Sequence, residues 1–263
     1  MSRKTAKLDR VTVTGADESV DPGDLLRLAS RYPLAEVAVL FGSGLGHAPR
    51  FPGVGWVVEL LRAWDSLPLS PPGERPKLAC HLCGEWVRHF LTFEDAPVPF
   101  LGNFGRYQLN TPAQPHVVDL GALRKSVERL SATGTQVIFQ VDDVNDELFE
   151  WARHARARPF LSDLRKLNVA ALFDLSHGSG LLPTEWPRSF VGSYCGYAGG
   201  LSPENVSGQL DRIVEEADGP FWVDAETHLR SGDDRVFDLV KVESFLAAAG
   251  EWARRRNLES ASP

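Results

Sequence analysis

Short apolar runs alternate with helix-like stretches along almost the whole chain. The runs have the length and composition of buried strands, and turns containing Gly or Pro separate them from segments with apolar residues at helical spacing. The expected strands cover residues 8–15, 35–41, 77–83, 106–110, 136–141, 169–174, 190–198 and 220–225. Alternating strands and helices favour a parallel sheet, and eight such units in 263 residues predict an α/β fold, a closed (β/α)₈ TIM barrel.

Helical patterns follow most of these strands. They cover residues 21–32, 56–64, 85–91, 119–130, 145–156, 202–216 and 236–256. We expect a single domain over residues 1–263, with inserted loops near 42–55, 65–76 and 92–105. A doubly wound open sheet is the alternative, but no glycine fingerprint of the dinucleotide-binding type follows the first strand.

Composition excludes several functional classes. The net charge is -7, from 28 basic and 35 acidic residues, so we expect no nucleic-acid partner. No apolar run is long enough to span a bilayer, and no apolar stretch follows the basic residues 1–7, so we expect a soluble cytoplasmic protein without a membrane partner. Cys80, Cys83 and Cys195 are an odd number, which argues against a disulfide framework.

Residues 197–206 read Tyr-Ala-Gly-Gly-Leu-Ser-Pro-Glu-Asn-Val. The pattern predicts a strand end, a glycine pair and a helix that Ser202 caps, with Pro203 in its first position. Glycines let the backbone come close to a ligand, and a helix N-terminus favours an anion. The alternative is a turn that only redirects the chain.

Polar residues lie at the expected strand ends, where barrel enzymes place their active sites. They are Thr14, His81, Cys83, Gln108, Asn110, Gln140, Asp142, Asp174, Asp224 and Glu226. Strand alternation puts His81 and Cys83 on one face and Cys80 on the other. Asp174 ends an apolar run, so it needs a partner or a catalytic role; the alternative is a structural aspartate that orders the following glycine loop. We expect no cofactor and no metal site.

Several stretches together resemble the phosphoribosylanthranilate isomerase family. Residues 198–206 resemble the phosphate motif after its seventh strand, and residues 173–180 with Trp186 resemble its sixth-strand motif. Looser similarity covers residues 48–50, 107–110 and 223–225. The resemblance implies a phosphate held after strands seven and eight, and an Amadori rearrangement in which an acid protonates the sugar ring oxygen and a base removes the C2 proton.

The resemblance also implies site residues. Asp174 corresponds to the general acid and Arg50 to an arginine that helps hold the substrate, and the other expected substrate-binding residues are Gln108, Asn110 and Asp224. The expected phosphate-binding residues are Gly178, Gly180, Gly199, Gly200 and Thr227.

The chain departs from that family at the base. Thr14 stands where the family has a cysteine, and an alkyl hydroxyl cannot act as that base by itself. Cys83 or His81 could replace it, because strand alternation directs both toward the barrel mouth. Asn110 and the pair Thr227-His228 also differ from the family pattern.

The leading hypothesis is therefore a sugar-phosphate isomerase of the aldose–ketose type, similar to the tryptophan-biosynthesis enzyme, with a non-standard base position. The first alternative is a barrel of the same lineage with lyase, aldolase or epimerase chemistry. The second is a non-catalytic protein that binds a phosphorylated ligand. A phosphorylated small molecule is the expected partner, and a homodimer is an open alternative for the assembly.

Overall fold

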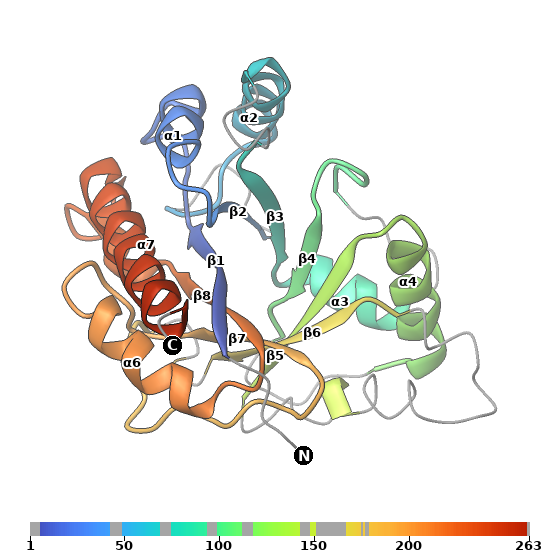
Figure 1. The fold of residues 1–263 in the computed structure, drawn as a ribbon. Coiled ribbons are helices and arrows are strands. Elements are labelled where there is room, and N and C mark those ends of the chain that lie inside the picture. The colour runs from blue at the N-terminus through green and yellow to red at the C-terminus, as the bar shows by residue number, and fades with distance from the viewer. Residues whose placement is uncertain are drawn as a thin grey trace.

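In the described part of the chain, eight parallel strands close into a barrel with helices on its outside (Figure 1). This computed structural model confirms the predicted (β/α)₈ architecture. The structure describes residues 6–42, 49–68, 75–93, 99–111, 118–142, 148–150, 167–174, 176 and 179–261.

The barrel strands follow the chain order. They are β1 (Lys7–Thr14), β2 (Ala35–Phe41), β3 (Lys77–Leu82), β4 (Arg106–Leu109), β5 (Gln136–Val141), β6 (Val169–Asp174), β7 (Tyr194–Ala198) and β8 (Pro220–Ala225). The helices around them are α1 (Pro22–Ala29), α2 (Val54–Ser66), α3 (Glu85–Thr92), α4 (Leu120–Ala132), α6 (Val206–Glu216) and α7 (Leu239–Ala261). After β8 come a 3₁₀ helix, η2 (Thr227–Leu229), and a two-stranded hairpin, β9 (Arg230–Ser231) and β10 (Val236–Phe237).

Each strand pairs with its neighbours in the sequence, and β1 pairs with β8 to close the barrel. The register places Asp174 of β6 beside Ala198 of β7, and Ala198 beside Asp224 of β8. Asp174 and Asp224 therefore lie at the same height in the barrel, separated by one strand. In a parallel barrel all strands point the same way, so both aspartates lie at the C-terminal mouth.

The main apolar core lies between the barrel and the helices. Leu25 of α1, Leu60 of α2 and Phe245 of α7 are fully buried against outward-facing strand residues such as Val13 and Val37. These helices form because each has one apolar face, which is stable only when it packs on the sheet. Figure 1 shows α7, in red, lying beside α6 and α1.

The interior of the barrel has an apolar half and a polar half. Ile138, Leu172 and Trp222 form the apolar cluster. Gly196 of β7 makes room for this cluster, because a Cβ at that position would lie 2.1 Å from the Trp222 ring. The polar half centres on Glu36, whose side chain is only 1% exposed and accepts hydrogen bonds from three side chains.

Several element boundaries differ from the sequence-based expectations. Residues 54–55 and 65–66 belong to α2, so the two expected loops are shorter at those ends. β7 begins at Tyr194 rather than 190, and α7 begins at Leu239 because Val236 and Phe237 pair with β9 instead. Of the helix expected over 145–156, the structure describes residues 148–150, which are helical.

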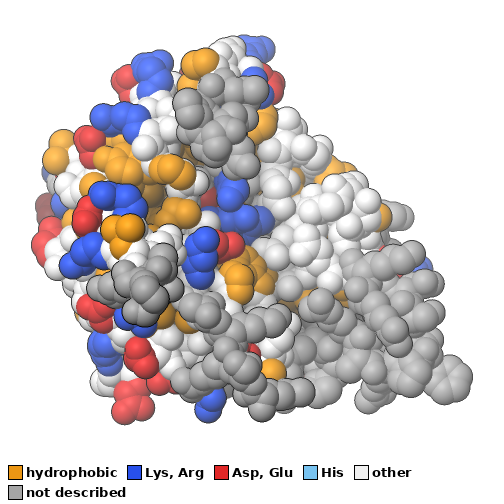
Figure 2. All heavy atoms as spheres, viewed as in Figure 1, with side chains coloured by type: hydrophobic (Ala, Val, Ile, Leu, Met, Phe, Trp, Pro, Cys, Tyr) orange, Lys and Arg blue, Asp and Glu red, His pale blue; other side chains and the backbone are white. Residues whose placement is uncertain are grey.

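The described helices include none that is long and apolar enough to cross a membrane. Figure 2 shows acidic and basic side chains interspersed over the face that carries α7 and α1.

Candidate functional site

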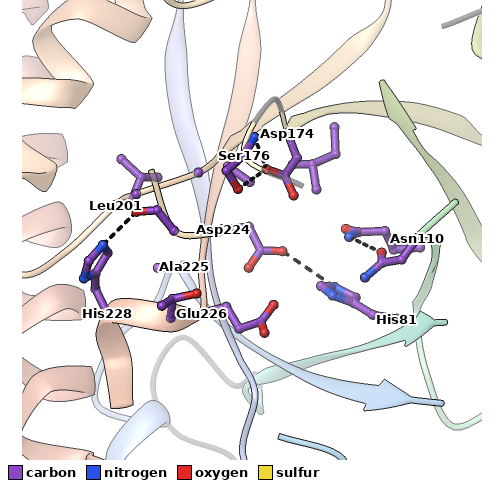
Figure 3. Close-up of a pocket in the computed structure, with 16 residues that line it drawn as sticks. His81, Asn110, Asp174, Ser176, Leu201, Asp224, Ala225, Glu226 and His228 are labelled. Carbon is purple, nitrogen blue, oxygen red and sulfur yellow. Dashed lines mark hydrogen bonds and ion pairs between the residues drawn. The ribbon is translucent and has the colours of Figure 1, made fainter. Parts of the chain in front are cut away.

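A polar pocket opens at the C-terminal mouth of the barrel (Figure 3). It encloses about 50 Å³. Strands β3, β4, β6, β7 and β8 and the segments after them supply its lining: His81, Gln108, Asn110, Leu172, Asp174, Ser176, Gly180, Ala198, Gly199, Gly200, Leu201, Asp224, Ala225, Glu226, Thr227 and His228. Most site residues named from the sequence therefore lie together, as the meeting of parallel strand ends requires.

Asp224 lies at the centre of this pocket. The Thr14 hydroxyl donates a 2.7 Å hydrogen bond to its Oδ1, and Nε2 of His81 lies 3.6 Å from its Oδ2. Burial raises the pKa of Asp224 well above its usual range, although the Thr14 hydrogen bond acts in the opposite direction. Burial therefore favours the protonated form of Asp224 more than it is favoured in a solvent-exposed aspartate.

His81 points into the barrel and faces Asp224 (Figure 3). Burial, together with the nearby charge of Arg106, lowers the pKa of His81 to about 3. The imidazole is therefore neutral at physiological pH, and its capacity to take a proton from carbon is small. It is suited to hydrogen bonding rather than to the base role considered from the sequence.

Asp174 lies at the edge of the pocket, at the end of β6. Its Oδ1 accepts hydrogen bonds from the backbone N–H of Ser176 at 3.1 Å and from the Ser176 hydroxyl at 2.6 Å. The side-chain amide of Gln140 lies 3.4 Å from its other oxygen. These donors are the partners that a carboxylate requires, so the fold holds Asp174 in a defined orientation and also orders the start of the following loop.

Cys83 and Cys80 have different surroundings. Cys80 is fully buried in the layer between barrel and helices, on the opposite face of β3 from His81, as strand alternation predicts. The Cys83 Sγ accepts a 3.4 Å hydrogen bond from the Asn110 amide and is not part of the pocket lining. Burial and the nearby Glu226 charge raise the pKa of Cys83 to about 12, so it remains a thiol.

Gln108 and Asn110 lie side by side on the wall formed by β4. The Gln108 amide donates a 2.6 Å hydrogen bond to Oδ1 of Asn110. The Oε1 of Gln108 is buried and has no hydrogen-bond donor in the described part of the chain. This carbonyl can accept a hydrogen bond from a hydroxyl or amine of a bound molecule.

Gly199 and Gly200 turn the chain away from β7, and both have positive φ, 110° and 65°. A Cβ on Gly200 would lie 2.4 Å from the backbone N of Leu182, so packing against the preceding loop already requires glycine there. Asn205 stabilises the turn, since its side chain donates to the Gly200 carbonyl and accepts from the Ser202 N–H.

The prediction that Ser202 caps the next helix is wrong. Residues 203–205 form a turn, and α6 begins at Val206. The Ser202 carbonyl accepts the N–H groups of Asn205 and Val206, and Asn205 holds the Ser202 N–H through its side chain. Pro203 therefore does not occupy the first helical position, because Asn205 closes the turn ahead of the helix.

Three segments that hold expected phosphate-binding residues meet on one side of the pocket. A Cβ on Gly180 would lie 2.9 Å from Cγ2 of Thr227, and Nε2 of His228 lies 2.9 Å from the Gly180 carbonyl. Gly180, Gly199, Gly200 and Thr227 therefore line one pocket, and Gly178 lies outside the described residues. The 3₁₀ helix η2 follows β8 on the same side of the pocket, and no side chain in the described part of the chain caps its N-terminus.

Arg50 and Glu226 form an ion pair above the end of β8. Nη1 of Arg50 lies 2.6 Å from Oε1 of Glu226 and 3.3 Å from the Thr227 hydroxyl, and its Nε lies 2.8 Å from Asp234. Burial raises the pKa of Glu226, although Arg50 acts in the opposite direction. Arg50 has a positive φ of 79° and donates its backbone N–H to Asp17, which fixes it at the mouth.

Sequence reasoning listed Glu226 among the polar strand-end residues and noted that the pair Thr227-His228 departs from the family pattern, but it gave Glu226, His228 and Ser176 no role of their own. A signal for Glu226 is its position two residues after Asp224, a period that returns a side chain to the same strand face. Ser176 also follows an aspartate by two residues, the spacing of a side-chain turn. In the described part of the chain, the structure contains no group of three or more His, Cys, Asp or Glu side chains that could hold a metal ion.

No protein-family model matches the chain, and no curated protein matches its sequence. Among solved structures, phosphoribosyl anthranilate isomerase from Thermotoga maritima is similar with a TM-score of 0.54 at 17% identity, over 93% of this chain and 100% of that one. A truncated 3-deoxy-D-arabino-heptulosonate 7-phosphate synthase from Thermotoga maritima also gives 0.54, at 11% identity, over 96% and 88%. These likenesses establish the fold, which an isomerase and a synthase share.

Proposed function

We propose that this protein is an enzyme that isomerises a phosphorylated sugar derivative, with one aspartate at the barrel mouth donating a proton to the substrate and a second aspartate removing another proton from it. The observation that carries the proposal is the placement of Asp174 and Asp224. They lie at the same height on β6 and β8, one strand apart, and line the same pocket. An aldose–ketose isomerisation needs an acid and a base on either side of one substrate.

The two carboxyl groups have different surroundings, and we assign them different roles. Burial raises the pKa of Asp224, which favours the protonated form that can donate to the sugar ring oxygen. Asp174 accepts two hydrogen bonds from Ser176, which fix its orientation, and we assign it the role of the base that takes the C2 proton. The ring C–O bond breaks as its oxygen is protonated, and loss of the C2 proton gives the enolamine that becomes the 1-amino ketose.

In this assignment Asp174 is the base, whereas the family resemblance implies that it is the general acid. Thr14, at the position of the family's base, takes no proton in the proposal. Its hydroxyl instead donates to Asp224 and fixes the orientation of that carboxyl group. Cys83 and His81 are the weaker candidates for a base, because the thiol has a pKa of about 12 and the imidazole a pKa of about 3.

The phosphate of the substrate would be held where Gly200, Gly180 and Thr227 meet. The Gly200 N–H has no acceptor among the described residues, and the N-terminus of η2 faces the same pocket. Nη1 of Arg50 lies 3.3 Å from the Thr227 hydroxyl and supplies a positive charge beside it. The negative charge of Glu226 would repel a bound phosphate. Burial raises the pKa of Glu226, which favours its neutral form and weakens that repulsion.

A non-catalytic protein that binds a phosphorylated ligand is the second candidate. It is favoured by Thr14, which offers a hydroxyl where the resembling family has its base. Lyase, aldolase or epimerase chemistry on another phosphorylated ligand would use the same two aspartates. Identifying the ligand and whether it is converted would distinguish the isomerase, the binding protein and the other chemistries.

The test measures both turnover of a substrate and binding of an unreactive analogue. Purified wild type is mixed with N-(5′-phosphoribosyl)anthranilate, and product is followed by NMR, beside binding of a reduced analogue by calorimetry. Product formation that Asp224→Asn and Asp174→Asn each abolish supports the enzyme. Analogue binding without turnover supports the binding protein. Neither binding nor turnover with this or other phosphorylated pentose and hexose derivatives would contradict the proposal.

A further inference from the structure

A second and larger cavity lies at the opposite, N-terminal opening of the barrel. It encloses about 900 Å³ and is lined by residues that begin strands, among them Arg106 of β4 and Tyr194 of β7. Its described charged lining residues are four basic groups and two acidic ones: Arg10, Arg75, Lys77, Arg106, Asp9 and Glu36. The opening is therefore electropositive.

Arg106 is a buried cation that uses only some of its nitrogens in hydrogen bonds. Its side chain is only 3% exposed, and its Nη1 donates a 3.0 Å hydrogen bond to Glu36. Its Nε and Nη2 are also buried, and neither has an acceptor in the described part of the chain. Burying charged donors without acceptors costs free energy, so this arrangement calls for a partner.

The two unpaired nitrogens of Arg106 lie on the same edge of the guanidinium plane. Nε–H and one Nη2–H point in parallel, which is the geometry that binds two oxygens of a carboxylate or phosphate. The guanidinium lies over the Trp222 ring, 4.2 Å from its centroid, so the plane and its edge are held in place. This preorganisation lowers the entropy cost of binding.

Glu36 does not supply the missing acceptor. Its two oxygens receive Nη1 of Arg10 at 2.8 Å, the Thr12 hydroxyl at 2.9 Å and Nη1 of Arg106, and none of these bonds involves Nε or Nη2 of Arg106. Asp9, another carboxylate of the same lining, accepts the Tyr194 hydroxyl at 2.5 Å. Arg10 has a buried Nε that likewise has no acceptor among the described residues. Arg10 and Arg106 thus both donate to the Glu36 carboxylate, and both keep buried nitrogens without an acceptor among the described residues.

We infer that the N-terminal opening of the barrel binds a small oxyanion, a carboxylate or phosphate, on the Nε–Nη2 edge of Arg106. The Nε of Arg10 is a second donor at the same opening. The lining of this cavity includes neither Asp174 nor Asp224, so the site is separate from the pocket at the C-terminal mouth. A carboxylate or phosphate group of a metabolite that enters from the N-terminal face has the required chemistry.

The test uses acetate and inorganic phosphate as probes, titrated into the full-length protein by calorimetry and thermal unfolding. Arg106→Lys keeps the charge but loses the bidentate edge, and Lys77→Gln removes a charge at the same opening without touching that edge. We expect Arg106→Lys to weaken acetate binding at least tenfold and Lys77→Gln to change it less than threefold. Equal weakening by both variants would indicate general electrostatics and overturn the inference.

A crystallographic measurement keeps the inference testable if Arg106→Lys does not fold. Wild-type crystals are soaked in bromoacetate and, separately, in arsenate, and the anomalous signal is located. We expect the carboxylate or arsenate within hydrogen-bond distance of Nε and Nη2 of Arg106. Density for water alone on that edge, or an anomalous peak only at the C-terminal mouth, would overturn it.

Discussion

The Thr14 hydroxyl donates a 2.7 Å hydrogen bond to Asp224, joining the ends of β1 and β8 where the barrel closes. Both side chains are buried, and the bond lies at the centre of the mouth. Burial raises the pKa of Asp224, and this hydrogen bond is the largest influence that lowers it. The site therefore depends on a contact between residues 210 positions apart in the chain.

Thr14→Val should lower the free energy of unfolding by about 1–2 kcal/mol, because it leaves a buried acceptor of Asp224 without its donor. It should also raise the pKa of Asp224 further. Thr14→Ser keeps the hydroxyl and is the matched control. Urea denaturation at pH 7 measures the difference. Equal losses in the two variants would show that packing of the methyl group, not the hydrogen bond, matters.

Asp224→Asn should alter how stability depends on pH. A carboxyl group whose folded pKa is raised contributes stability below its unfolded pKa, about 3.9, and loses it as pH rises through the folded value. Wild type should therefore lose stability relative to Asp224→Asn as pH increases from 4 toward 8. Urea denaturation across this range measures the effect, and a constant difference between the two proteins would contradict it.

His81 should stay neutral from pH 8 down to pH 5, because its pKa is lowered to about 3 by burial and by Arg106. The ring ¹⁵N chemical shifts of His81 report its charge and can be assigned by comparison with His81→Gln. Since the unfolded pKa is about 6.5, this group stabilises the fold above that pH and its contribution falls during acidification toward pH 3. A His81 titration near pH 6.5 would refute the expectation.

Gly200→Ala should destabilise the fold by about 2–4 kcal/mol, because φ is 65° and the new Cβ would lie 2.4 Å from the Leu182 backbone. Gly208 in α6 is the matched control. A Cβ there meets nothing within 4 Å, so Gly208→Ala should stabilise by about 0.5–1 kcal/mol. Thermal and urea unfolding measure both. Comparable stability of Gly200→Ala and wild type would mean that the turn can move away from Leu182.

Asp174→Asn and Asp224→Asn should each lower kcat by about 10²–10⁴-fold if the proposed isomerase reaction occurs, because loss of a positioned acid or base has that effect. Asp224→Asn should also remove the decline of kcat at alkaline pH, since that decline reports loss of the acid's proton. Asp211→Asn, on α6 away from the mouth, is the control. A retained alkaline decline in Asp224→Asn would assign the acid to another group.

Much of the fold could be predicted from the sequence, because its signals are local. The apolar runs at 35–41, 136–141 and 169–174 match β2, β5 and β6 residue for residue. A strand buried on both faces consists mainly of apolar residues, and its polar exceptions here, such as Glu36 and Gln140, have hydrogen-bond partners. The predicted element boundaries were wrong where a non-local or side-chain contact decides them. The side chain of Asn205 bonds to Ser202 and Gly200 and closes a turn, so α6 begins later than predicted.

The sequence by itself determined the barrel and placed Asp174, Asp224 and the glycine turn at its C-terminal mouth, because strand order and a period of two fix which end and which face a side chain occupies. Only the tertiary structure decided the partners of these side chains and the raised pKa of Asp224. Thr14 meets Asp224 because β1 pairs with β8, and Arg106 meets Glu36 through one nitrogen while its Nε and Nη2 are buried without an acceptor in the described part of the chain. Such contacts join residues distant in the chain, and burial, which sets the pKa of Asp224, exists only once the barrel closes.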